Sequence, residues 1–164
     1  MWNKKKVARM PHIFRYLKLE VDSQYGSDKV IQMSRIEFID SSGNYVNAPT
    51  MSNYNLVGCT APSAEQPPKA FDHSVDTKMC LTDITFPISV TMDFGQLWLN
   101  TNIYNRWQWY TANDFTPARN MKTYRLYGSV DGNTWYLFDS QVDGSYTTQT
   151  KTLAYTGNII VRRA

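Results

Sequence analysis

Alternation of apolar and polar residues with a period of two recurs along the chain and predicts β-strands. In residues 88–94, apolar side chains alternate with polar ones until Gly95 ends the run. Such alternation is typical of a strand that buries one face and exposes the other to solvent. The same reasoning predicts strands at 15–21, 31–38, 106–110, 123–127, 135–138 and 158–161.

One predicted strand changes the phase of its alternation partway along. Ile31 and Met33 share one parity, whereas Ile36 and Phe38 have the other. A strand with a strict period of two cannot bury all of these side chains on one face. We therefore expect a β-bulge near Ser34–Arg35.

Turn-forming residues separate the predicted strands. Asp131 and Gly132 are expected to have structural roles in one such turn. Glycine adopts the positive φ of a tight turn at low cost, and aspartate is common in turns. Trp135 then opens the next strand. The stretch 59–72 holds three prolines and is expected to be an ordered loop. No segment shows the 3.6-residue hydrophobic period of an amphipathic helix. The sequence therefore predicts one all-β domain, an antiparallel β-sandwich or jelly roll.

The composition agrees with a single globular domain. The chain has 164 residues, of which 42% are hydrophobic and 19% are charged, and these values exclude a disordered chain or a coiled coil. No apolar run reaches the roughly 18 residues that span a bilayer, so membrane insertion is not expected. The first residues lack the apolar segment of a secretory signal, although removal of a signal before this numbering would leave the same pattern.

Positive charge is concentrated at the start of the chain. The net charge is +3, yet residues 1–18 hold six basic side chains and no acidic one. We expect residues 1–13 to form a basic arm outside the sandwich, which would occupy residues 14–164. Such an arm either docks on the acidic surface of a larger assembly or is simply solvated. The weak overall charge argues against a dedicated nucleic-acid-binding protein.

Sequence motifs for catalysis are not found. The two histidines lack metal-ligand spacing, and the motifs of serine hydrolases, phosphate loops and dinucleotide-binding folds are missing. The scattered acidic residues leave a carboxylate pair for glycoside hydrolysis open, but the sequence as a whole favours a protein that is not an enzyme. Cys59 and Cys80 either form a disulfide in an exported chain or remain free thiols.

Aromatic residues are a more informative group. The chain holds 11 tyrosines and five tryptophans, and in a sandwich most of them, including Trp107 and Trp109, are expected in the core. Binding residues concentrate on loops held by a rigid scaffold. We therefore expect a ligand face on the loops near 45–58 and 97–106. Its candidate ligand residues are Tyr45, Tyr54, Trp98, Tyr104 and Arg106.

A family resemblance rests on two parts of the chain. Residues 110–120 and 124–135 form one part, and residues 65–79, with an alanine, an aspartate and a threonine in order, form the other. Together they resemble the discoidin domain, also called the coagulation-factor C-type domain, over about 60–138. The resemblance implies a galactose-binding-like jelly roll that usually binds glycans and sometimes lipid headgroups or proteins. The strands that usually close such a module resemble those that open this chain.

The resemblance also implies a structural calcium ion in many members. Asp72 and Thr77 match the family's metal loop, but Arg35 occupies the place of the carboxylate from the closing strand. A guanidinium offers calcium no oxygen. We therefore expect no cofactor, with Arg35 replacing the ion and bonded to loop carbonyls or to Asp72 or Asp76. Glu37 would restore a calcium site if the register shifted by two residues.

Asp114 and Arg119 stand five residues apart across a predicted loop. This separation allows them to form an ion pair that holds the loop, which gives both a structural role. In the alternative, Arg119 contacts a ligand.

These observations predict a non-catalytic binding module that recognises carbohydrate through loops at one end of the sandwich. The alternative is a structural or assembly component, such as a virion capsid, tail or surface-layer protein, that uses the sandwich as a scaffold and the basic arm for docking. The expected partner is a glycan or glycosylated surface in the first case and a larger protein assembly in the second. Either role would place the protein outside the cell or on a virion.

Overall fold

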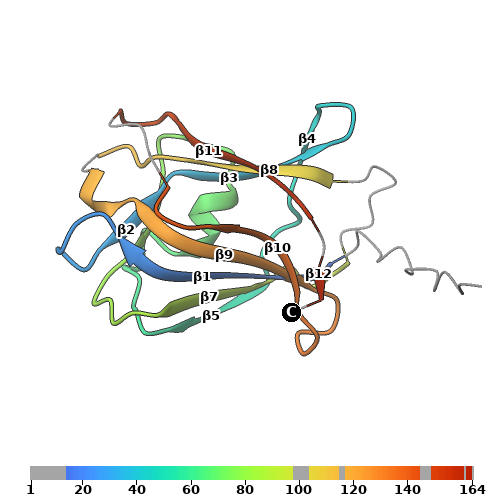
Figure 1. Cartoon of the computed structure of the whole chain (residues 1–164), viewed down its shortest axis with the longest axis horizontal. Helices are drawn as coiled ribbons and strands as arrows, with labels where there is room; N and C mark the ends of the chain where they lie inside the picture. Colours follow the sequence, from blue (N-terminus) through green and yellow to red (C-terminus); the bar gives the residue numbers. More distant parts are fainter. Residues whose placement is uncertain (1–13, 98–103, 115–116, 145–148, 161, 164) are drawn as a thin grey trace, which may run out of the picture.

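The computed structural model describes residues 14–97, 104–114, 117–144, 149–160 and 162–163. Within these residues the chain folds into antiparallel β-strands joined by turns, loops and two short 3-10 helices (Figure 1). The prediction of an all-β protein is confirmed. The expected basic arm at 1–13 and the candidate ligand residue Trp98 lie outside the described residues.

The larger sheet has six strands in the order β12-β10-β9-β1-β7-β5. Its strands are β1 (Tyr16–Gln24), β5 (Asn53–Val57), β7 (Ile88–Asp93), β9 (Met121–Ser129), β10 (Tyr136–Gln141) and β12 (Arg162–Arg163). β1 pairs antiparallel with both β7 and β9. Leu17, Leu19 and Val21 of β1 are fully buried, as their alternation with polar residues predicts.

The second sheet has four strands in the order β11-β8-β3-β4. They are β3 (Arg35–Asp40), β4 (Tyr45–Val46), β8 (Tyr104–Tyr110) and β11 (Leu153–Asn158). Trp107 and Trp109 of β8 are fully buried, as predicted, and both make edge-on ring contacts with Tyr124 of β9 in the larger sheet. The two sheets thus share one apolar core, an arrangement compatible with a β-sandwich.

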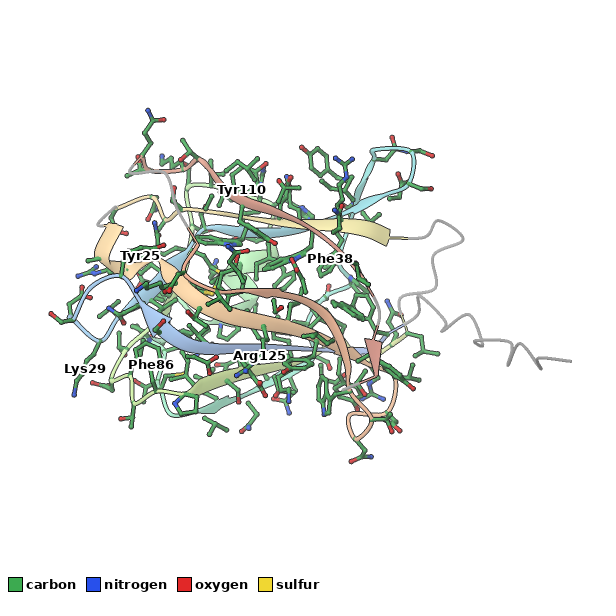
Figure 2. All side chains as sticks on the ribbon, viewed as in Figure 1. Tyr25, Lys29, Phe38, Phe86, Tyr110 and Arg125 are labelled. Atoms are coloured by element: carbon green, nitrogen blue, oxygen red, sulfur yellow. The ribbon has the colours of Figure 1, made fainter. Side chains whose placement is uncertain are left out.

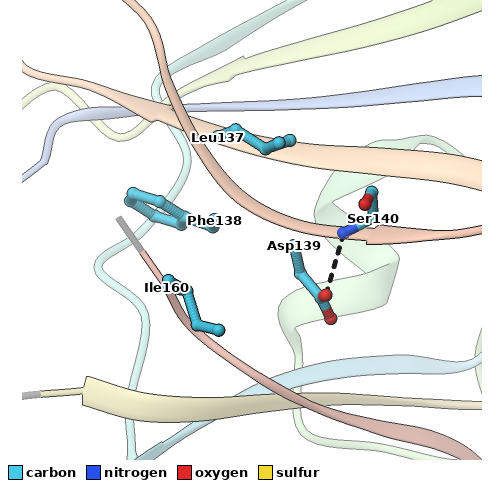
Figure 3. A pocket seen from close by; sticks show the side chains of 5 residues that line it. All are labelled: Leu137, Phe138, Asp139, Ser140 and Ile160. Carbon is cyan, nitrogen blue, oxygen red and sulfur yellow. Dashed lines mark hydrogen bonds between the residues drawn. The ribbon is translucent and has the colours of Figure 1, made fainter. Parts of the chain in front are cut away.

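A polar contact also joins the two sheets. Asp139 of β10 accepts hydrogen bonds from Trp107 Nε1 and from the hydroxyl of Tyr155 in β11, both at 2.8 Å. Burial, together with the nearby carboxylate, raises the pKa of Tyr155. Asp139 also lines a cavity of about 90 Å³. There it accepts a hydrogen bond from the backbone N–H of Ser140 (Figure 3).

The phase change near Ser34 has a different cause from the expected bulge. Ile31–Met33 form β2, which pairs with β6 (Met79–Leu81) in a separate two-stranded sheet. β3 then begins at Arg35 and pairs with β8. Ser34 lies between them, and its backbone N–H donates to the carbonyl of Tyr110. The chain therefore passes from one sheet to another at this residue, which lets the apolar residues on both sides reach the core.

The proline-rich stretch predicted as a loop contains the 3-10 helix η1 (Pro67–Phe71). Proline suits the first positions of a helix, because its fixed φ matches the helix and its missing N–H would have no partner there. Ala70 and Phe71 are buried, and η1 contacts β3 and β6. A second 3-10 helix, η2, spans Pro117–Arg119. In the described part of the chain no helix is long and apolar enough to cross a membrane.

The turn before β10 forms as predicted. Gly132 has a φ of 76°, and Asp131 Oδ1 accepts hydrogen bonds from the backbone N–H groups of Thr134 at 2.7 Å and Asn133 at 2.9 Å. These bonds lower the pKa of Asp131 to about 2. Trp135 follows, half-buried, directly before β10.

Cys59 and Cys80 are free thiols in this structure. Cys80 is buried and Cys59 is half-buried, and burial raises the pKa of both. Of the two alternatives left open by the sequence, the structure shows the unpaired form.

Candidate binding face on the four-stranded sheet

Polar and aromatic side chains cover the side of the four-stranded sheet that faces away from the core. Trp107 and Trp109 point into the core, so every second residue of β8 points outward. The same holds for β3, whose Ile36 and Phe38 lie in the core. The outward residues of the two strands are Arg106, Gln108 and Tyr110 of β8 and Arg35, Glu37 and Ile39 of β3.

Strand register arranges these side chains in rows across the sheet. In one row Thr156 of β11, Gln108 and Glu37 are neighbours. In the next row Asn158, Arg106, Ile39 and Tyr45 follow one another across all four strands. Together with Arg35 and Tyr110, we call the residues of these rows the outer face.

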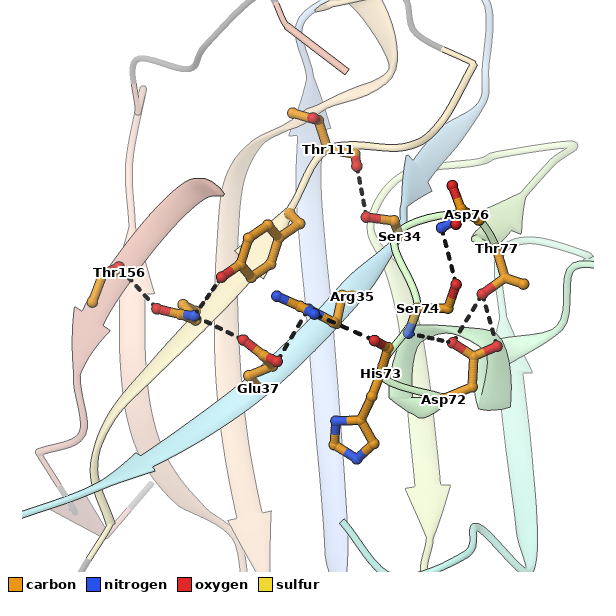
Figure 4. Close-up of polar contacts among 12 residues, drawn as sticks. Ser34, Arg35, Glu37, Asp72, His73, Ser74, Asp76, Thr77, Thr111 and Thr156 are labelled. Atoms are coloured by element: carbon orange, nitrogen blue, oxygen red, sulfur yellow. Dashed lines mark hydrogen bonds and ion pairs between the residues drawn. The ribbon is translucent and has the colours of Figure 1, made fainter. Parts of the chain in front are cut away.

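A hydrogen-bonded network holds the centre of the outer face. Gln108 Nε2 donates to Glu37 Oε2 and to the Tyr110 hydroxyl, both at 2.8 Å. Arg35 Nε lies 3.1 Å from the other carboxylate oxygen of Glu37 (Figure 4). Glu37 and Gln108 are only 5% and 4% exposed although they are on the outer side of the sheet. A buried charge is tolerated when it is paired and hydrogen-bonded, and both conditions are met for Glu37.

Arg35 connects the outer face with the loop that follows η1. Its guanidinium lies over the ring of Tyr110, 4.2 Å from the ring centre, and Nη1 donates to the carbonyl of His73 at 3.3 Å (Figure 4). His73 has a φ of 61°, a left-handed conformation that is uncommon for residues other than glycine. The bond from Arg35 therefore helps to hold a strained residue in place.

The row that contains Arg106 combines an exposed ring with a guanidinium. Tyr45 is 59% exposed, whereas Tyr110 is half-buried and burial raises the pKa of its phenol. Arg106 and Tyr45 stand on either side of Ile39, two strand spacings or roughly 10 Å apart. The structure thus places in one row two candidate ligand residues that the sequence assigns to different loops.

The other candidate ligand residues lie elsewhere or have no described side chain. Tyr54 belongs to β5 of the larger sheet and packs half-buried against the core. Tyr104 is the first residue of β8, and its side chain lies outside the described residues. Arg119 Nε lies 2.7 Å from Asp28 Oδ2 in the loop between β1 and β2.

Asp114 and Arg119 do not form the expected ion pair. Arg119 pairs with Asp28, and Asp114 pairs with Lys78, which also lies 3.3 Å from Glu65. Closeness along the chain does not fix where two side chains point, and each of these finds a partner on another element. Both residues therefore join loops, but not to each other.

The loop after η1 does not fit a calcium ion. Both oxygens of the Asp72 carboxylate accept from Thr77 Oγ1, at 2.8 and 2.7 Å, and Oδ1 also accepts from the backbone N–H of Ser74. Lys69 Nζ lies 3.9 Å from Asp72 Oδ2, and Arg35 brings a second positive charge to the loop. Calcium favours six to eight oxygen ligands, several of them anionic. Among the described residues no three His, Cys, Asp or Glu side chains are placed to hold a metal.

The carboxylates considered as partners for Arg35 or for calcium have other contacts. Asp76 Oδ1 lies 2.5 Å from Lys151 Nζ, and Glu37 is held by Arg35 and Gln108. Of the expected partners of Arg35, the structure shows a loop carbonyl, that of His73, rather than Asp72 or Asp76.

Several residues of the outer face are missing from the sequence-based ligand candidates. They are Glu37, Gln108, Tyr110, Thr156 and Asn158. These residues lie within strands, whereas the sequence-based candidates lie on predicted loops. The available signal was the alternation in β8, where Arg106, Gln108 and Tyr110 alternate with the two buried tryptophans. This alternation indicates a row of polar residues on the outer side of the sheet.

Two larger cavities lie at other places on the molecule. A cavity of about 300 Å³ lies between residues 48–51 and η1, with Asp72 and His73 on its lining. A cavity of about 280 Å³ includes Lys29 and Phe86, which Figure 2 shows at one end of the molecule. Neither is lined by a residue of the outer face.

Comparisons with known proteins do not assign this chain to a family. Protein-family models, curated proteins and solved structures give no match.

Proposed function

We propose that this protein is a non-catalytic module that binds carbohydrate through its outer face. The observation that carries the proposal is the row in which the exposed Tyr45 and the guanidinium of Arg106 flank Ile39. An aromatic ring offers an apolar plane to the C–H face of a sugar. Guanidinium, amide and hydroxyl groups bind sugar hydroxyls, and the outer face provides all three.

The network beside this row supports binding because it holds Glu37, Gln108 and Arg35 in place before a ligand arrives. Glu37 and Gln108 are buried and bonded to each other, and Arg35 is held by Glu37 and by the carbonyl of His73. Side chains that are already ordered lose little conformational entropy when a ligand binds. A face of this kind suits a ligand with many hydroxyl groups in fixed directions.

The acidic groups of the outer face favour binding without catalysis. Glu37 is its single carboxylate, and both Arg35 and Gln108 engage it. Most glycoside hydrolases need two carboxylates about 5–10 Å apart, one of them free to donate a proton. The outer face offers no such pair.

The proposal extends to the fold, which we assign to the galactose-binding-like jelly rolls of the discoidin class. The resemblance of residues 110–135 and the two antiparallel sheets around one core support this assignment. Tyr45 follows the turn between β3 and β4 at one end of the molecule (Figure 1). The proposed site therefore includes one end of the sandwich, as the sequence suggests, but extends over the sheet.

Glycan-array screening followed by calorimetric titration of the best ligand tests the proposal. We expect Tyr45→Ala to weaken binding at least tenfold, because it removes the stacking plane, while the melting temperature stays close to that of the parent. Tyr25→Ala is the matched control, since Tyr25 is also exposed, at 41%, and lies at the opposite end of the molecule (Figure 2).

Two outcomes would overturn the proposal. One is glycan binding that Tyr45→Ala leaves unchanged, which would move the site elsewhere. The other is silence across the array together with a multimeric mass in solution, which would favour the assembly role.

A further inference from the structure

The outer face carries an excess positive charge that no acidic side chain balances. Its two guanidiniums belong to Arg35 and Arg106, and its carboxylate belongs to Glu37. Arg35 Nε lies 3.1 Å from Glu37 Oε1, so these two charges neutralise each other. Among the described ion pairs none includes Arg106.

The segments outside the described residues add no Asp or Glu side chain that could pair with Arg106. The chain holds 14 Asp and Glu residues, and none of them falls in the segments outside the described residues. Nine of the lysine and arginine side chains that the structure describes have an acidic side chain within 4.0 Å. Lys29 and Arg106 are the exceptions within that part of the chain. Arg106 is therefore free to pair with an acidic group from outside.

We propose that the ligand of the outer face is a sugar that bears a carboxylate, and that Arg106 binds this carboxylate. The inference rests on the proposed function and adds the class of sugar. A guanidinium presents a planar fork of N–H donors that matches a carboxylate with two parallel hydrogen bonds. Lys29 lacks this geometry and lies away from the outer face, beside the 280 Å³ cavity.

The neighbours of Arg106 suit the rest of such a ligand. Asn158 lies beside it on β11 and is exposed, so its amide can bind ring hydroxyls. Ile39 lies on the other side and is 5% exposed, so it forms an apolar floor between Arg106 and Tyr45. A uronic or sialic acid residue over Arg106 would place the adjoining sugar toward the Tyr45 ring, roughly 10 Å away.

Paired sugars that differ in their acidic group test the inference. The probes are an oligogalacturonate with its carboxyl-reduced, neutral counterpart, and sialyllactose with lactose. We expect at least one acidic member to bind about tenfold more tightly than its neutral counterpart at low salt. The difference should shrink as ionic strength rises, because Arg106 is half-exposed and its charge is screened.

Variants then assign the preference to the side chain. Arg106→Gln should weaken binding of the acidic sugar more than binding of its neutral counterpart, and so abolish the preference for the acid. Arg106→Lys should keep part of the preference for the acid, because the positive charge remains but the planar fork of N–H donors is lost. Lys29→Gln is the matched control, since it removes the same charge from a basic residue that also lacks an ion pair. It should leave the preference for the acidic sugar unchanged.

The results separate this inference from the proposed function. Neutral sugars that bind through Tyr45 with no gain for either acid would overturn the inference and leave the function standing. A preference for the acid that survives in Arg106→Gln would also overturn the inference. Failure of every sugar, acidic or neutral, would overturn the proposed function itself.

Discussion

Replacement of Arg35 by methionine tests how the outer face and the loop after η1 are held together. Methionine keeps much of the length of the side chain and removes the guanidinium. The variant loses the ion pair with Glu37, the hydrogen bond to the carbonyl of His73 and the contact with the ring of Tyr110. Gln108 then remains as a hydrogen-bond donor to Glu37.

The burial of the two partners sets the expected magnitude. Removal of one partner of a buried ion pair costs about 3–5 kcal/mol, because the other charge is left uncompensated. The side chain of Glu37 is 5% exposed, but that of Arg35 is 21% exposed, so water can reach part of the space that the guanidinium leaves. We therefore expect Arg35→Met to lower the free energy of unfolding by about 2–3 kcal/mol.

Urea unfolding followed by tryptophan fluorescence measures this loss, and a double variant identifies its cause. Glu37→Gln in the Arg35→Met background removes the uncompensated charge and should recover about 1 kcal/mol or more. Lys18→Met is a useful control, because the side chain of Lys18 is also 21% exposed but its partner Glu20 is 25% exposed. A pair of this kind contributes at most about 1 kcal/mol.

Two results would refute the reasoning about Arg35. The first is a loss below about 0.5 kcal/mol for Arg35→Met, which would mean that Glu37 is stable without its cation. The second comes from calcium titration of the parent protein, for which we expect no change in melting temperature. A rise of several degrees that a chelator reverses would show that the loop of Asp72 binds the ion and that Arg35 does not exclude it.

Two further predictions concern other parts of the fold. Asp139→Ala should lower the free energy of unfolding by about 2–4 kcal/mol, because the donors of Trp107 and Tyr155 lose their acceptor, and chemical denaturation measures this loss. The pKa of Asp131 is lowered from an unfolded value of about 3.9 to about 2, so its carboxylate stabilises the fold above pH 4 and that contribution is lost between about pH 4 and pH 2. Melting curves across this range should show a smaller decline for Asp131→Asn than for the parent, and equal declines would contradict the assignment.

The alternation of the sequence predicts the strands that have one buried and one solvated face. β1, β7, β8 and β9 all lie inside a sheet and bury regularly spaced apolar residues, so their pattern is clear. β5 and β11 are edge strands whose residues are mostly exposed or half-buried, so they lack a continuous apolar row. Such strands are held by pairing with a neighbour, and pairing leaves no signal in the strand's own sequence.

The types of residue in the proposed site were partly predictable from the sequence, but their arrangement in one row was not. A tyrosine and an arginine on predicted loops are recognisable as ligand candidates, and Tyr45 and Arg106 meet this description. Their common row depends on the pairing of β4 and β8 with β3, and this strand order joins segments that are distant in the sequence. The prediction that Asp114 pairs with Arg119 was wrong, because it assumed that residues close in the sequence are also close in space.

The direction of the outer face is set by contacts on the other side of the sheet. Trp107 lies between Arg106 and Gln108 in β8, and Asp139 of the larger sheet accepts the hydrogen bond of its indole. Because alternate residues of a strand point to opposite faces, a β8 shifted by one residue would bury Arg106 and expose Trp107. The indole contact and the ring of Tyr124 oppose this shift. Any ligand that binds Arg106 therefore depends on a core contact that it does not touch.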